Sequence, residues 1–365
     1  MPFDDRSFPS IEAAQQRRRR LRVSTWLFVV AAMIWGMVVL GGATRLTGSG
    51  LSIMEWAPLS GVLPPVSANE WDRLFALYKT IPQYALLHPG MDLAGFKSIF
   101  WLEWAHRFWG RLVGLVFALP LVWFAVTGAI PRRMVPRLVG LFVLGGLQGA
   151  VGWFMVASGF TADATAVSPY RLVIHLTLAL SLFAAVLWTA LSTASPVATS
   201  IRHATTLRRL AATTAVLVAC TIVAGGFTAG LHAGLIYNSF PLMDGRWFPA
   251  GYADLHPFLR NLTENVTAVQ FDHRLLATLT ATIALITVIV GVLARAVLPV
   301  TAGMALACLG CAITVQYGLG VATLVTGVAV PLAIAHQATA VALLASALTL
   351  THTLRGARWR SPLRT

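Results

Sequence analysis

The amino-acid sequence predicts an all-α polytopic membrane protein with eight transmembrane helices, arranged as two four-helix bundles related by a pseudo-twofold axis. Three observations predict this fold class. Of the 365 residues, 57% are hydrophobic and only 11% are charged, whereas a soluble domain carries roughly 25% charged residues. Eight apolar runs are long enough to cross a bilayer. Glycine and histidine motifs of the first half recur in the second half.

The eight apolar runs are separated by short basic segments and by two long polar loops. The expected membrane spans are 24–42, 101–127, 136–156, 170–192, 209–230, 269–294, 301–325 and 331–353. Each is close to the ~20 residues that a helix needs to cross the hydrocarbon core. The segments 43–100 and 231–267 are too polar to span. An even number of spans places both ends of the chain on one side.

The basic residues predict the orientation. Of the 27 Lys and Arg residues, 17 lie in the tails and short loops on the side of the two termini. The positive-inside rule therefore predicts cytoplasmic termini in the cell inner membrane, with the long loops facing the periplasm. The net charge of +14 could also suggest nucleic acid. We expect no nucleic-acid partner, because basic clusters between apolar runs are typical of cytoplasmic loops.

An internal repeat divides the chain into two halves. The motif Gly41-Gly42-x-Thr44 recurs as Gly225-Gly226-x-Thr228, at an offset of 184 residues, and Gln148 corresponds to Gln316. The expected divisions are a tail 1–22, a first bundle 23–197, a second bundle 198–354 and a tail 355–365. With four spans in each half, both copies enter the membrane in the same direction, and the pseudo-twofold axis follows the membrane normal.

Four of the nine histidines occupy equivalent places in this repeat. His106 and His175 open the second and fourth spans of the first half, and His273 and His336 do the same in the second half. All four are expected near the outer membrane face. Two nitrogen ligands in an apolar bundle fit a heme iron better than zinc or copper, which need more ligands. The alternative for a single such histidine is a hydrogen-bonded interfacial residue.

Charged residues accompany two of these histidines. Arg107 and Arg274 directly follow a histidine, where each could pair with a heme propionate, with a lipid headgroup or with a carboxylate. Glu103 lies one helical turn before His106, whereas the equivalent position holds the neutral Gln270. A carboxyl beside a heme could move a proton or stabilise a developing positive charge. The alternative is a simple ion pair between Glu103 and Arg107.

The three cysteines do not point to a metal or redox site. Cys220, Cys308 and Cys311 all lie inside apolar runs, so no disulfide can link them in a polar loop. The spacing Cys308-x-x-Cys311 resembles a redox motif. On a membrane helix, however, two small packing residues are the better interpretation.

The motifs together resemble the heme A synthase family of proteobacteria and mitochondria, over nearly the whole chain. The resemblance is carried by Gly41-Gly42-Ala43-Thr44-Arg45-Leu46-Thr47-Gly48-Ser49-Gly50-Leu51-Ser52, Glu103-x-x-His106-Arg107, Gln148-Gly149-x-x-Gly152-Trp153, Ser168-Pro169-Tyr170-Arg171-x-x-x-His175, Tyr237-Asn238-x-Phe240-Pro241-Leu242-Met243-Asp244-Gly245, Phe271-Asp272-His273-Arg274 and His336-Gln337. It implies oxidation of heme O to heme A, by successive hydroxylation of a porphyrin methyl to a formyl, for heme-copper oxidase biogenesis.

The resemblance also implies a role for each site residue. His273 and His336, with Arg274 nearby, would bind a heme b cofactor as axial iron ligands in the second bundle. His106 and His175, with Arg107, would hold the substrate heme in the first bundle. Glu103 matches the catalytic carboxylate of the family. Some bacterial members carry a cysteine pair in the first outward loop, and residues 43–100 contain none.

Two other functions stay open at this point. A di-heme electron-transfer protein of cytochrome b type would use all four histidines as structural ligands. A heme transporter or chaperone would bind heme without chemistry. The expected partners are the heme O substrate, membrane lipid, heme O synthase and an electron donor, and assembly into a homo-oligomer is left open.

Overall fold

The computed structural model of this protein describes residues 11–58, 60–195, 204–295 and 298–356. The outer parts of the two expected tails, 1–10 and 357–365, lie outside the described residues. The described residues form helices joined by turns and loops, and they contain no named β-strand. The helices are α1 (Ile11–Leu46), α2 (Ala68–Tyr78), α3 (Pro82–Leu87), α4 (Leu93–Val126), α5 (Val135–Val156), α6 (Pro169–Ala194), α7 (Thr205–Gly230), α8 (Asn261–Glu264), α9 (Val266–Leu293), α10 (Val300–Val325) and α11 (Val330–Thr353).

Eight helices within the described residues are long and apolar enough to cross a membrane: α1, α4, α5, α6, α7, α9, α10 and α11. The all-α, eight-span prediction is therefore confirmed, and the chain is a multi-pass membrane protein. Six of the expected spans agree with their helices within a few residues at each end. Two helices extend well before the predicted starts, because α1 begins within the basic tail and α4 begins within the first long loop.

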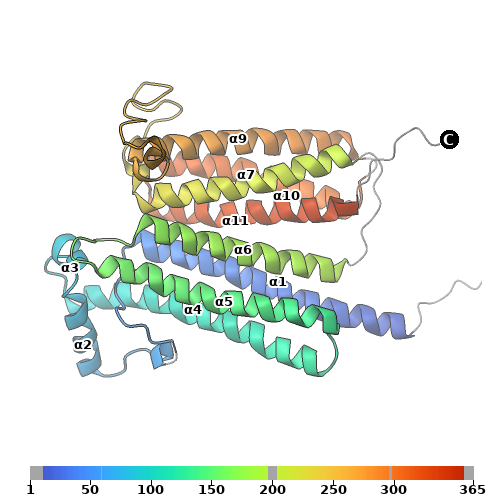
Figure 1. Ribbon diagram of the computed structural model, residues 1–365, viewed down its shortest axis with the longest axis horizontal. Helices are drawn as coiled ribbons and strands as arrows, with labels where there is room; N and C mark the ends of the chain where they lie inside the picture. The colour runs from blue at the N-terminus through green and yellow to red at the C-terminus, as the bar shows by residue number, and fades with distance from the viewer. Residues whose placement is uncertain (1–10, 59, 196–203, 296–297, 357–365) are drawn as a thin grey trace, which may run out of the picture.

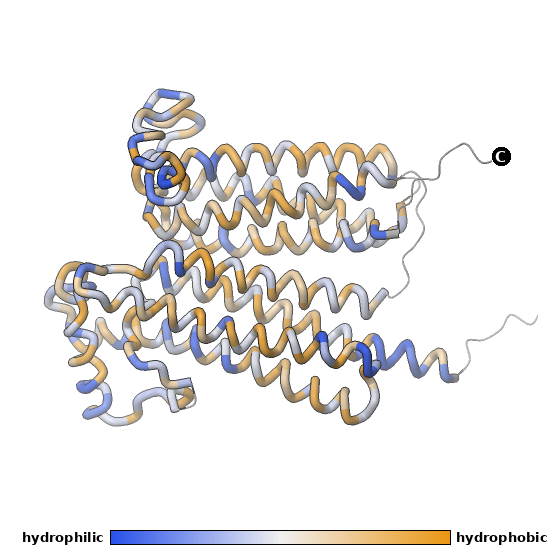
Figure 2. The backbone as a smooth tube through the Cα atoms, in the orientation of Figure 1, coloured by the Kyte–Doolittle hydropathy of each residue, from blue (hydrophilic) through white to orange (hydrophobic). Residues whose placement is uncertain are grey.

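The spanning helices are arranged in two groups of four (Figure 1). In the first group α1 contacts α4, α4 contacts α5, α5 contacts α6, and α6 returns to α1. In the second group α7, α9, α10 and α11 make the corresponding series of contacts. The groups meet through α1, α6, α7 and α11, while α4 and α5 lie on the side away from the second group. Figure 2 shows that apolar residues predominate along these helices.

Polar contacts connect the two groups near the motif glycines. Gln337 on α11 donates a hydrogen bond to the Val38 carbonyl on α1 (2.7 Å), and the Trp35 indole donates to the Ala338 carbonyl (2.9 Å). The side chain of Gln337 lies directly against Gly42, where a Cβ atom would collide with its amide. Gly42 thus leaves room for the Gln337 side chain to reach the Val38 carbonyl.

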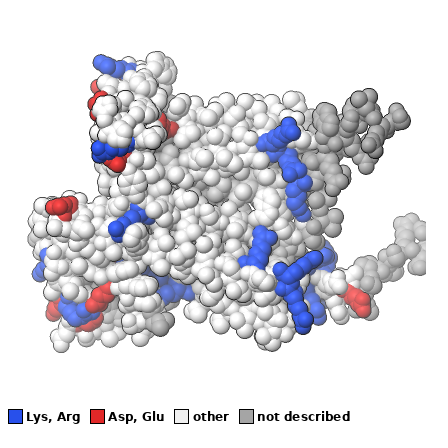
Figure 3. Space-filling model, in the orientation of Figure 1, with Lys and Arg blue, Asp and Glu red and all other residues white. Residues whose placement is uncertain are grey.

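The two ends of the molecule differ in character. Helices α1 and α7 run toward the end that carries α2, α3 and the segment 231–265, which we call the loop end (Figure 1). At the loop end, a separate apolar cluster joins the first loop to the start of α4, with Tyr78 and Phe96 fully buried. At the opposite end, which we call the terminus end, α1 begins and α11 ends. Figure 3 shows arginines gathered there, and a middle region with few charged groups.

Several helices begin at side chains that suit their position. Asp92 and Asn265 accept hydrogen bonds from the first free N–H groups of α4 and α9. Proline occupies the first turn of α5, α6 and α11, where its missing N–H has no cost. Because α4, α6, α9 and α11 all begin at the loop end, the four predicted histidines all lie in the part of the molecule nearest that end.

Candidate functional site

Glu103 is the most extensively bonded carboxylate of the first half. Its side chain is buried, with 2% of the residue exposed. Its Oε2 atom accepts hydrogen bonds from the Ser52 hydroxyl (2.7 Å) and the Ile53 N–H (2.9 Å). Its Oε1 atom accepts from Nε (3.1 Å) and Nη2 (2.6 Å) of Arg107. Four donors surrounding two oxygens form the pattern that a carboxylate anion accepts.

Arg107 connects this carboxylate to the first loop. Beyond its ion pair with Glu103, its guanidinium donates to the carbonyls of Ile53 (2.6 Å) and Glu55 (2.8 Å). The ion pair between Glu103 and Arg107, which the sequence left open as an alternative, is thus present. Arg107 also holds the backbone of Ile53, whose N–H donates to Glu103. Its guanidinium lies over the Trp153 ring of α5, 5.5 Å from the centroid. A heme propionate would have to share these donors.

The second half repeats this arrangement around a neutral side chain. Arg274 donates to the carbonyls of Ser239 (3.0 Å) and Pro241 (2.8 Å), so it too holds the loop after the first helix of its half. Gln270 is 2% exposed and donates from Nε2 to the Tyr237 carbonyl (3.1 Å). Its Oε1 atom and Nη1 of Arg274 are buried without a partner among the described residues.

Each of the four histidine rings packs against a glycine on a neighbouring helix of its own half. The pairs are His106 with Gly41, His175 with Gly152, His273 with Gly225 and His336 with Gly320. A Cβ atom at these glycines would lie 3.1, 2.8, 2.9 and 3.0 Å from the respective ring. The contacts at Gly152 and Gly225 are shorter than real Cβ atoms make, and those at Gly41 and Gly320 are tighter than nine in ten real contacts. The glycines therefore give the imidazoles room inside the bundles.

Hydrogen bonds orient three of these imidazoles. Nδ1 of His273 lies 3.2 Å from the Thr221 carbonyl, so that a proton on Nδ1 donates there and leaves Nε2 free. Gln148 donates to Nδ1 (3.1 Å) and to the backbone carbonyl (3.0 Å) of His175. Gln316 lies 3.5 Å from Nε2 of His336, whose Nδ1 is buried without a partner. Within the described residues, His106 has no hydrogen bond to its ring.

Asp272 does not act on the neighbouring histidine. Its Oδ1 accepts a hydrogen bond from the Tyr252 hydroxyl (2.9 Å). Tyr252 lies in the second long loop, and burial raises its pKa to about 12, so it remains a donor at neutral pH. This contact ties the loop to α9 outside the histidine pair.

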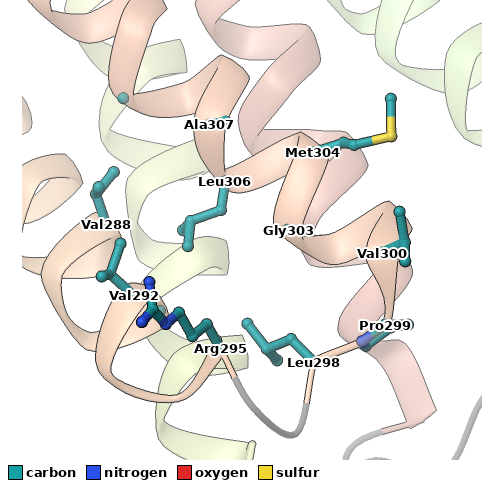
Figure 4. A pocket seen from close by; sticks show the side chains of 12 residues that line it. Val288, Val292, Arg295, Leu298, Pro299, Val300, Gly303, Met304, Leu306 and Ala307 are labelled. Carbon is teal, nitrogen blue, oxygen red and sulfur yellow. The ribbon is translucent and has the colours of Figure 1, made fainter.

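Other predicted features lie apart from this site. An open hollow of about 630 Å³ lies between α9 and α10 at the terminus end. Figure 4 shows Val288, Leu306 and Arg295 around it, and none of the four histidines lines it. Cys308 and Cys311 on α10 are free thiols. Sequence reasoning missed Ser52, Thr221 and the glycine packing, although the repeated glycine motifs carried a signal for the last.

Comparison with known proteins identifies a family for this chain. Residues 24–348 match the family described as cytochrome oxidase assembly protein. The Heme A synthase of Granulibacter bethesdensis is 59% identical over 347 residues, which cover 94% of this chain and 90% of that protein. Heme A synthase 2 of Acidiphilium cryptum is 50% identical over 350 residues, 94% of each chain. The Heme A synthase of Nitrosospira multiformis is 45% identical over 338 residues, covering 91% and 93%.

The match extends across both histidine pairs, because residues 24–348 include His106, His175, His273 and His336. It also includes Glu103. The relatives are similar along nearly their whole lengths rather than in one bundle alone. On this basis, the chain belongs to the heme A synthase family of cytochrome oxidase assembly proteins.

Proposed function

We propose that this protein converts heme O to heme A, by successive hydroxylation of a porphyrin methyl to a formyl, and so supplies heme-copper oxidases. The observation that carries the proposal is the unequal pair Glu103 and Gln270. Two halves with the same architecture differ in having an ionisable carboxylate beside only one histidine pair. A protein that only carried electrons between two hemes would have no need of that difference.

The donor set fits a heme in each half. Within the described residues there is no group of three or more His, Cys, Asp or Glu residues placed to hold a bare metal ion. A heme needs only axial ligands from the protein, because its macrocycle supplies the other four. The glycine contacts leave space at the rings, and unpartnered buried atoms of Gln148, Gln316 and His336 remain available nearby.

We assign the resident heme b to His273 and His336 and the substrate heme to His106 and His175. Support comes from the hydrogen bond of His273 to the Thr221 carbonyl, which holds the ring in one orientation and suits a permanent ligand. In the proposed substrate site Gln148 orients His175, while the ring of His106 has no hydrogen bond within the described residues. The four imidazoles are expected near the periplasmic face, in an inner-membrane protein with cytoplasmic termini.

Bound heme supplies the redox chemistry at its iron. The protein's own contribution is electrostatic. Ser52, Ile53 and Arg107 hold Glu103 in one position, so the carboxylate can stabilise positive charge that develops at the carbon being oxidised. Since all four of its hydrogen bonds come from protein donors, Glu103 is better arranged as a fixed charge than as a proton carrier. Heme O synthase and an electron donor are the partners this reaction requires.

The test is heme extraction from membranes of a host that makes heme O but no heme A, with and without this gene. We expect heme A or its hydroxylated precursor only in membranes that contain the protein. The control is the Glu103→Gln variant, which should retain bound heme but form little product. If only extra heme b appears, in a host shown to supply heme O and reductant, the protein is an electron carrier instead.

A further inference from the structure

Each half has an outer pair of helices, and we call the contact between the two helices of that pair the seam. The seams of the two halves are built differently. In each half, the second and third spanning helices lie on the side away from the other half: α4 and α5 in the first, α9 and α10 in the second (Figure 1). These seams therefore face the surrounding bilayer. Fewer residue pairs of α4 and α5 come close together than of α9 and α10, and a smaller share of α4 and α5 is buried.

Tyr317 closes the seam of the second half. Its hydroxyl on α10 forms a hydrogen bond with the Thr278 hydroxyl on α9 (3.1 Å). The edge of the Phe240 ring, from the second long loop, packs against it with centroids 6.3 Å apart. Further along the seam, Leu306 of α10 lies directly against Gly291 of α9. The two helices are thus held together both near the histidine pair and at the terminus end.

In the first half, the ring and cation–π contacts between α4 and α5 lie toward the two ends of the seam. Toward the loop end, Arg107 of α4 lies over the Trp153 ring of α5. Toward the terminus end, Phe117 and Phe142 stack with centroids 6.0 Å apart. Between these contacts no hydrogen bond, ion pair or ring contact joins α4 to α5, both of which are described in full. The interval is about ten residues of each helix, or roughly 15 Å.

The first half has a glycine at the position equivalent to Tyr317. Gln148 and Gly152 of α5 correspond to Gln316 and Gly320 of α10, since each pair contacts the equivalent histidine. The same offset places Gly149 opposite Tyr317. A Cβ atom at Gly149 would have no heavy atom within 4 Å, and the same is true of the nearby Gly146 and Gly114. The first half therefore has open space where the second half has a hydrogen-bonded ring.

We propose that the first half opens sideways to the bilayer between α4 and α5, and that a lipophilic heme enters and leaves its site there, whereas Tyr317 closes the equivalent seam and retains the heme of the second half. This inference rests on the proposed function, in which only the first-half heme turns over. A heme is a flat and largely apolar molecule, so passage from the hydrocarbon core avoids exposing it to water. The reaction needs exchange at one site and retention at the other, and the two seams differ accordingly.

The direct test places a tyrosine in the first half at the position equivalent to Tyr317. We would reconstitute the Gly149→Tyr protein in lipid nanodiscs with heme b in the second half. Uptake of heme O from donor vesicles would then be followed by stopped-flow absorbance. We expect uptake and release to slow by about tenfold, because the new ring would occupy the space through which heme is proposed to pass. Gly140→Tyr is the matched control: it lies on α5 beyond the Phe142 contact, also with nothing near its Cβ, and should behave as the unaltered protein.

The reverse change tests retention. Tyr317→Gly should speed the loss of second-half heme to an excess of a heme-scavenging apoprotein, and Tyr317→Phe should fall between Tyr317→Gly and the unaltered protein. The second-half heme spectrum of Gly149→Tyr reports that the protein is folded. An unchanged exchange rate in folded Gly149→Tyr would overturn the lateral opening while leaving the proposed function intact. A first half that binds no heme O in the unaltered protein would overturn both.

Discussion

The two halves secure the loop after their first helix at the same point, but with opposite polarity. In the first half, Glu103 accepts a hydrogen bond from the Ile53 N–H. In the second half, Gln270 donates one to the carbonyl of Tyr237, which lies 184 residues after Ile53 and so corresponds to it in the repeat. An arginine one turn later holds the same loop in both halves. The architecture is therefore shared, and the charge at its centre is not.

The histidines show a second difference of the same kind. Nδ1 of His273 is bonded to the Thr221 carbonyl, whereas the equivalent position, Met37, makes no hydrogen bond to His106. The imidazole one turn after the neutral Gln270 is thus restrained, whereas the imidazole one turn after Glu103 has no hydrogen bond to its ring within the described residues. Under the proposed function, one half of the duplicated scaffold retains a heme and the other half acts on one.

The largest effect is expected from removing a restrained ligand. His273→Ala should abolish the tightly bound heme of the second half, because an axial ligand and its fixed orientation are both lost. His106→Ala should leave that heme in place and prevent stable binding of added heme O. The measurement is the absorbance spectrum of the purified protein and its heme content. His256→Ala, which removes an exposed loop histidine, is the control. A normal heme spectrum in His273→Ala would refute the assignment.

The next effect is expected from exchanging the two unequal side chains. Glu103→Gln should lower product formation by about 10²–10³-fold, the usual cost of removing a preorganised charge from an active site. Gln270→Glu places a carboxylate in the second half, next to the Tyr237 carbonyl instead of an N–H donor such as that of Ile53. This change should alter the heme b potential rather than create a second reaction. The measurements are heme A formed per bound heme b and a redox titration. Full activity in Glu103→Gln would remove the proposed role of the carboxylate.

Much of this comparison was visible in the sequence. The spans from 136 onward were predicted within a few residues, because an apolar run of bilayer length has few alternatives. The repeat of Gly41-Gly42 as Gly225-Gly226 and the Glu103/Gln270 difference also followed from the residues alone. The starts of α1 and α4 were missed because polar, helix-favouring residues continue a helix beyond the membrane without changing the hydropathy signal.

The hydrogen bonds that define the site could not be predicted. Ser52 and Ile53 reach Glu103 across about fifty residues of chain, through a loop whose path has no periodic signal. The bond from His273 ends on a backbone carbonyl, which any residue at position 221 would supply. The difference between Gly149 and Tyr317 could not be interpreted without the structure, in which Tyr317 joins two helices by a hydrogen bond. These contacts depend on the tertiary structure, and the sequence alone identifies only the residues that can take part in them.

The smallest of the three effects concerns the glycines beneath the imidazoles. Ala in place of Gly152 would put its Cβ 2.8 Å from Cε1 of His175, so the ring must shift. We expect substrate-heme binding to weaken by roughly tenfold or more, the range that about 1–3 kcal/mol of overpacking produces. Gly320→Ala should instead shift the spectrum of the second-half heme, because its Cβ lies 3.0 Å from His336. Gly140→Ala meets no neighbour and should leave both sites unchanged. If Gly152→Ala and Gly140→Ala bound heme O equally well, the close packing at His175 would have no part in holding the substrate.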